Sequence, residues 1–132
     1  MLHSGDCMID SEAAPGSMAA HRWLTFAGGV MAAASVALSA YAAHAASGAG
    51  QASLQAAAAI AFGHGLALAA LSRLARRRLA IIALAAMVLG TLLFSGGVLV
   101  AHVAGVPART APFGGSLLIV AWLAWAMDAL RR

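Results

Sequence analysis

The sequence predicts an all-α integral membrane protein, a bundle of four membrane-spanning helices with both termini in the cytoplasm. Three observations lead to this prediction: the composition, four long apolar runs and the distribution of arginine. Of the 132 residues, 63% are hydrophobic and only 9% are charged, whereas about 25% of the residues of a soluble domain are charged. A small soluble domain could not cover its surface with so few polar groups.

Each of the four apolar runs is long enough to cross a bilayer, which takes about 20 residues for a hydrocarbon core about 30 Å thick. Backbone groups in lipid must be satisfied within their own segment, and the runs lack the alternation of a barrel strand, so we expect helices. Together they form one transmembrane domain, residues 21–132, with spans at about 23–45, 52–72, 79–104 and 113–130.

Residues 1–20 precede the first span and hold three of the four acidic residues, together with Pro15 and Gly16. We expect a disordered cytoplasmic tail, in which Met18 is an alternative start. The first span has an alternative reading as well. Its apolar run ends in AHA at 43–45, like a cleavable signal peptide, but about 20 residues exceed the usual apolar region of about 7–15. We therefore favour a retained span.

The second span is the weakest of the four because it consists mostly of alanine. Its six large apolar side chains contribute about −2 to −3.5 kcal/mol to insertion, and His64 and Gln55 reduce that gain. We expect this span to depend on its neighbours. The third span is rich in Leu, Ile and Val and should insert by itself.

The charge distribution sets the orientation. The chain contains arginine but no lysine. With four spans, both termini and the middle loop share one side of the membrane, and the opposite side carries Arg109 alone. The positive-inside rule then places both termini in the cytoplasm, with Trp23 as an interfacial anchor. The seven arginines of that side are Arg22, Arg73, Arg76, Arg77, Arg78, Arg131 and Arg132.

The net charge of +4 would also suit a nucleic-acid partner. The arginines lie between apolar runs, however, and not along a face with interleaved aromatic residues. We therefore expect no nucleic-acid partner. The expected surroundings are the lipid bilayer, with a second copy or another membrane protein as partner.

Small residues at helical spacing predict close helix contacts, which replace the missing hydrophobic drive in lipid. One row lies in the first span and one in the third. They are Gly29, Ala33 and Ala37, and Gly97, Ala101 and Gly105.

The chain resembles the small bacterial membrane proteins of domain-of-unknown-function family 423, related to eukaryotic transmembrane protein 256. The resemblance covers about 24–130. The chain departs from the family's pattern in SAYAA, which precedes His44, and in AAAAIAFG, which precedes His64. The resemblance implies a four-helix protein of the bacterial inner membrane, and the family has no established activity to carry over. The matching residues are AAH at 42–44, His64 with LALAAL, Gly90, LFSG at 93–96, Pro112, Gly114, Gly115 and Ala121–Trp122.

His64 is the main candidate for a functional residue. It lies about ten to twelve residues into its span, which is roughly 15–18 Å deep and near the midplane. Ionisable groups at that depth usually face the bundle interior and find a partner. One interpretation is a proton relay or ligand contact. The other, which we favour, is a neutral imidazole hydrogen-bonded to a serine or to the backbone.

The remaining polar candidates offer little chemistry. His44 and His102 lie near the outer ends of their spans, but two imidazoles make a poor zinc site, and the single cysteine, Cys7, adds no cage. We expect no metal and no cofactor. Ser95 in mid-span could bond to His64, yet a nucleophile pair needs an orienting carboxylate. The only acidic residue in the spans, Asp128, lies at the opposite end, so we expect no catalytic residue and no enzyme.

A helix-entry motif begins the fourth span. Pro112 suits a first helical turn, where its missing N–H costs nothing, and Gly114 and Gly115 permit close packing. At the other end of this span we expect Asp128 to form an interfacial ion pair of small worth with Arg131 and Arg132.

From the sequence alone, the chain is therefore a non-enzymatic structural or interaction subunit of unknown role. The alternative is a small transporter or proton-conducting protein that uses His64. A conducting protein requires a continuous polar route past this residue, whereas a packed bundle would seal it with apolar side chains.

Overall fold

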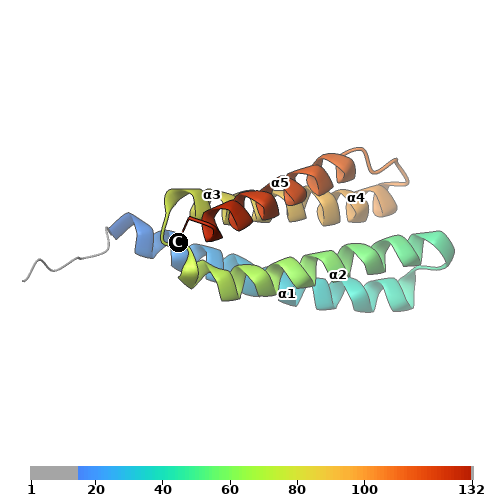
Figure 1. The fold of residues 1–132 in the computed structure, drawn as a ribbon. Helices are drawn as coiled ribbons and strands as arrows, with labels where there is room; N and C mark the ends of the chain where they lie inside the picture. Colours follow the sequence, from blue (N-terminus) through green and yellow to red (C-terminus); the bar gives the residue numbers. More distant parts are fainter. Residues whose placement is uncertain (1–14, 132) are drawn as a thin grey trace, which may run out of the picture.

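A computed structural model describes residues 15–131 of the chain, and this part is helical with no strand. Figure 1 shows two helical hairpins that lie side by side, one made by the first two long helices and the other by the last two. The elements are α1 (Pro15–Ala45), α2 (Gly48–Leu71), a 3₁₀ turn η1 (Ser72–Leu74), α3 (Arg78–Thr91), a π-helical turn η2 (Leu92–Gly96), α4 (Gly97–Ala104) and α5 (Ala111–Ala129).

The predicted all-α membrane fold is confirmed. Since α3, η2 and α4 run on as one rod, the chain has four helical rods long and apolar enough to cross a membrane. The first rod begins earlier than predicted, because α1 starts at Pro15, a residue suited to a first helical turn. Residues 15–20, expected in the tail, are therefore helical, while the rest of that tail lies outside the described residues. The four rods are Met18–Ala45, Gly48–Leu74, Arg78–Ala104 and Ala111–Ala129.

The antiparallel order of the rods gathers the arginines at one end. The start of α1, the turn after α2, the start of α3 and the end of α5 meet there (Figure 1). We call it the arginine-rich end; Arg109, before α5, lies at the opposite end. The described residues that define it are Arg22, Arg73, Arg76, Arg77, Arg78 and Arg131.

Within the first hairpin, α1 and α2 touch through glycine. A Cβ atom built on Gly28 would lie 2.6 Å from the carbonyl oxygen of Gly65, and one on Gly65 would lie 2.8 Å from that of Gly28 and 2.9 Å from the backbone nitrogen of Ala32. No real side chain fits at these distances. Both residues are therefore glycine because the two backbones approach each other directly.

The second hairpin uses the same device. A Cβ atom on Gly90 of α3 would lie 3.1 Å from the carbonyl oxygen of Gly114 on α5, and one on Gly114 would lie 2.7 Å from that of Gly90. Leu118 packs over the same contact, 3.0 Å from the hypothetical Cβ of Gly90. Gly114 of the predicted entry motif is thus a packing residue.

The predicted small-residue rows are only partly right. Gly29 has open space around it, and Ala33 and Ala37 on the same face are exposed. The contact face of α1 is rotated by one residue and carries Gly28. In the second row, Gly97 does pack closely, against Thr110. The row ends at Gly105, which adopts φ = 65° as the left-handed cap of α4 and so serves a turn instead of a helix contact.

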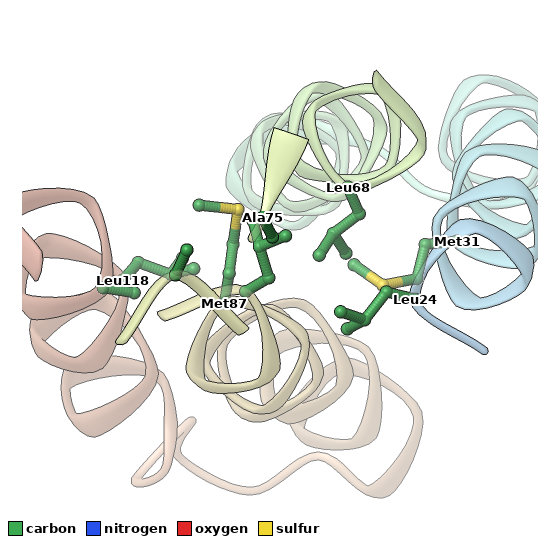
Figure 2. Packing of buried hydrophobic residues seen from close by; sticks show 9 residues of the cluster. Leu24, Met31, Leu68, Ala75, Met87 and Leu118 are labelled. Atoms are coloured by element: carbon green, nitrogen blue, oxygen red, sulfur yellow. The ribbon is translucent and has the colours of Figure 1, made fainter. Parts of the chain in front are cut away.

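One buried cluster holds the two hairpins together (Figure 2). Leu68 of α2 points toward Leu24 and Met31 of α1, while Met87 of α3 lies between α2 and Leu118 of α5. Leu68 and Met87 are fully buried. The cluster lies in the half of the bundle nearer the arginine-rich end.

The two glycines that flank His64 provide a matched test of the packing. Gly65→Ala places a methyl group against backbone atoms of α1, and overpacking of this kind costs about 1–3 kcal/mol. A Cβ on Gly63 meets nothing within 4 Å, so Gly63→Ala should be neutral or should stabilise the helix by about 0.5–1 kcal/mol. Unfolding in mixed micelles, followed by circular dichroism, gives both values. Equal effects of the two substitutions would contradict the glycine contact.

Candidate functional site

His64 lies in the middle of α2 and uses both ring nitrogens. Nδ1 is 2.7 Å from the carbonyl oxygen of Ile60, one turn earlier in the same helix, and Nε2 is 3.1 Å from Nε1 of Trp122 on α5. An indole nitrogen only donates and a carbonyl only accepts. Nδ1–H therefore donates to Ile60, and Nε2 accepts from Trp122. This pattern requires the neutral ring with its proton on Nδ1.

The hydrogen bond between Trp122 and His64 connects the two hairpins. Trp122 belongs to α5 and His64 to α2, and their ring centroids are 6.1 Å apart. His64 is half-buried, and the side chain of Trp122 is 40% exposed. The pair therefore lies at the edge of the bundle and closes the seam between α2 and α5.

Ser95 makes a second polar link between the hairpins. It lies in η2 and is buried, and its hydroxyl donates to the carbonyl oxygen of Ala57 on α2 at 2.8 Å. Ala57 precedes His64 by seven residues, which is about 10 Å along the helix. Ser95 and His64, considered together as candidates from the sequence, thus bind different groups.

The π-helical turn that carries Ser95 was not predicted. It interrupts the third span over Leu92–Gly96, and the backbone N–H of Gly97 bonds to the carbonyls of Leu93 and Phe94. π-turns in α-helices often occur at functional sites. Here the wider turn directs a hydroxyl to the neighbouring helix. The sequence did contain a signal, because Ser-Gly-Gly is a poor helix former.

His44 and His102 both lie near the end opposite the arginine-rich end. His44 is exposed at the end of α1, and His102 in α4 packs edge-on against Tyr41, with ring centroids 6.2 Å apart. The ring of His102 also covers Gly50, whose Cβ would lie 2.9 Å from its Cε1. Within residues 15–131, no three His, Cys, Asp or Glu side chains come together in a group that could hold a metal ion.

The predicted entry motif occupies the first turn of α5. Pro112 lies at its first or second position, where a missing N–H costs nothing. Gly114 is buried against α3, as described above, whereas a Cβ on Gly115 would make only ordinary contacts, 3.8 Å from the ring of Phe94. Of the two glycines, only Gly114 is required by the packing.

Asp128, which we predicted to form an ion pair at the membrane interface, is buried in the bundle. It is 1% exposed. The reason is the antiparallel packing of α5 on α3, which pairs Gly114 with Gly90. Fourteen residues further along α5, Asp128 therefore lies level with the first turn of α3, where a carboxylate near the positive end of a helix is favourable.

Hydrogen bonds at the arginine-rich end, which were not predicted from the sequence, connect two further elements. Nε2–H of His21 donates to the carbonyl oxygen of Ala75 at 2.7 Å, and the hydroxyls of Thr25 and Ser72 lie 2.7 Å apart. These bonds connect α1 to the turn between α2 and α3. The signal was available, because His21 and Thr25 are four residues apart and share one helix face.

Of the comparisons with known proteins, one identifies a family. The sequence model of a family described as a protein of unknown function (DUF423) matches residues 38–115, which extend from the second half of α1 to the first turn of α5. No curated protein and no solved structure matches the chain. Since the match covers more than half of the sequence, and includes His64, Ser95 and Gly114, the chain belongs to this DUF423 family of unknown function.

Proposed function

We propose that the chain is a non-enzymatic, multi-pass protein of the bacterial inner membrane that acts as a structural or interaction subunit. Both termini lie in the cytoplasm in this proposal. The orientation is supported by the arginine-rich end, which carries six arginines among residues 15–131, against Arg109 at the other end. The positive-inside rule assigns the richer end to the cytoplasm.

The absence of enzymatic activity is proposed from the positions of the candidate groups. The hydroxyl of Ser95 donates to a backbone carbonyl, and both nitrogens of His64 are engaged elsewhere. Asp128 is at the arginine-rich end of α5, far from either. A nucleophile, a base and an orienting carboxylate are therefore separated from one another.

The observation that carries the proposed interaction is a groove between α1 and α2, here called the α1–α2 groove. Its volume is about 580 Å³, and small residues form most of its walls, with Val36 and Phe62 as larger rims. Ser39 and Gln55 line it, both exposed. Because the side chains that form the walls are small, another helix can approach closely.

The side chains of Ser39 and Gln55 indicate what covers the groove. Among the described residues neither side chain has a hydrogen-bond partner. Continuing the antiparallel pairing of Ala32 with Gly65 places them within about one turn of each other. A polar group in a span gains by bonding across helices. Because hydroxyl and amide both donate and accept, a second copy related by a two-fold axis could satisfy all four groups.

Cysteine cross-linking in native membranes tests the paired form. In a Cys7→Ser background, Ala40→Cys in the groove should give a disulfide-linked dimer upon mild oxidation, because Ala40 lines the proposed interface. Leu123→Cys, on the exposed side of α5, is the matched control and should stay monomeric.

Adding Gln55→Leu to Ala40→Cys should lower the dimer yield about threefold or more, since a hydrogen bond between membrane helices contributes about 0.6–2 kcal/mol. Absence of the Ala40 dimer, or an equal yield at Leu123, would contradict pairing through this groove.

The alternative, proton conduction through His64, has less support. Its ring is held by two hydrogen bonds in the neutral form. The residues that line the α1–α2 groove do not include it. Its two hydrogen-bond partners are the backbone carbonyl of Ile60 in the same helix and the indole N–H of Trp122 on α5.

Proteoliposome flux decides between the two functions. We expect wild-type protein to conduct no more protons than empty vesicles at any pH between 5 and 8, and His64→Ala to behave identically while remaining folded. Trp122→Phe removes only the N–H that donates to Nε2 of His64, and it serves as the control in which the imidazole ring is kept. Proton flux in the wild type that His64→Ala abolishes would overturn the proposal in favour of the alternative.

A further inference from the structure

A second groove begins at the arginine-rich end and continues into the seam between α1 and α3. Its first part lies on α1 alone and is lined by Ala19, Arg22, Trp23 and Phe26. Trp23 and Phe26 continue into a second part of about 510 Å³, which runs past Val30 and Val88. We call these two parts together the α1–α3 groove.

The groove follows from the way the helices pair. The glycine contacts lie inside each hairpin, between α1 and α2 and between α3 and α5. The facing sides of α1 and α3 carry larger side chains, and the two rods stay apart. Several of these side chains remain open to the surroundings: Trp23 is 70% exposed, Phe26 62% and Val30 50%.

The length of the groove matches one leaflet of a bilayer. From Arg22 to Met31, at its far end, is nine residues, or about 14 Å of helix. Half of a hydrocarbon core about 30 Å thick is about 15 Å. The groove therefore extends from the membrane surface to the midplane, as an extended acyl chain does.

The charge at the mouth of the groove is positive. Arg22 lines the first part of the groove, and Arg78 begins α3 at the same end of the bundle. The only carboxylate side chain within residues 15–131 is Asp128, which is buried on α5, on the far side of α3. Trp23 and Phe26 stack edge to face at 5.9 Å beside Arg22, which gives the mouth an aromatic wall.

We propose that the α1–α3 groove binds an anionic phospholipid. The phosphate of the headgroup pairs with Arg22, and one acyl chain lies over Trp23, Val30 and Val88 toward the midplane. A headgroup of net negative charge is preferred over a zwitterionic one, because an arginine near the membrane surface attracts anionic lipids. This inference is independent of the α1–α2 groove and of any pairing of the chain.

Quenching of tryptophan fluorescence by brominated lipids tests the proposal. The full chain is reconstituted in phosphatidylcholine vesicles that contain a small fraction of dibrominated phosphatidylglycerol or, in parallel, dibrominated phosphatidylcholine. The signal of Trp23 is obtained by subtracting the fluorescence of Trp23→Phe from that of the wild type. This subtraction removes the contributions of Trp122 and Trp125. We expect the anionic lipid to associate at Trp23 about fivefold more strongly, and high salt to reduce this preference.

Two matched pairs of variants distinguish the contribution of the lipid headgroup from that of the acyl chain. Arg22→Gln should abolish the preference, whereas Arg131→Gln, exposed at the same end just after α5, should retain it. Ala85→Phe fills the groove and should lower quenching by the anionic lipid to the level of bulk lipid; Ala126→Phe, exposed on α5, should not. Equal association of both lipids with the wild type, or an unchanged preference in Arg22→Gln, would overturn the proposal.

Discussion

Direct contact between helix backbones is the constraint on which the rest of this structure depends. In lipid, apolar side chains gain little by leaving their surroundings for one another, and helices associate through close packing and hydrogen bonds. Gly28 against Gly65, and Gly90 against Gly114, provide that packing. Each contact closes one hairpin, and the two hairpins then meet through larger side chains. The α1–α3 groove is a consequence, because it follows a seam in which no glycine pair draws the rods together.

Polar bonds join the two hairpins in addition to the buried cluster. Ser95 donates to the backbone of α2 from one side of the seam, and Trp122 donates to His64 from the other. Each bond satisfies a group that would otherwise be costly in a span. Such bonds contribute about 0.6–2 kcal/mol apiece, enough to fix the mutual register of two otherwise separate units. The central histidine, which invites a functional interpretation, accepts one of these connecting bonds.

Much of the fold could be predicted from the sequence, because the length of the apolar runs and the clustering of arginine depend on the membrane alone. The details that depend on tertiary packing could not. Alanine and glycine are so frequent that the face of α1 carrying Gly28 is indistinguishable by spacing from the one carrying Gly29. The π-turn that aims Ser95 at α2 is a response to a neighbouring helix, and the partner of His64, Trp122, is 58 residues away in the chain. The burial of Asp128 was not predicted, because it results from the pairing of α5 with α3.

The family to which the chain belongs has no described activity, so its four-rod architecture is the natural subject of a decisive test. Reporter fusions placed after residue 18, in the turns at 46–47, 75–77 and 106–109, and after residue 131 measure the side of the membrane on which each turn lies. The account predicts that the ends and the turn at 75–77 share the cytoplasmic side and that the turns at 46–47 and 106–109 lie on the other. Termini on opposite sides, or a turn at 46–47 on the same side as 75–77, would contradict two closed hairpins that cross the bilayer four times.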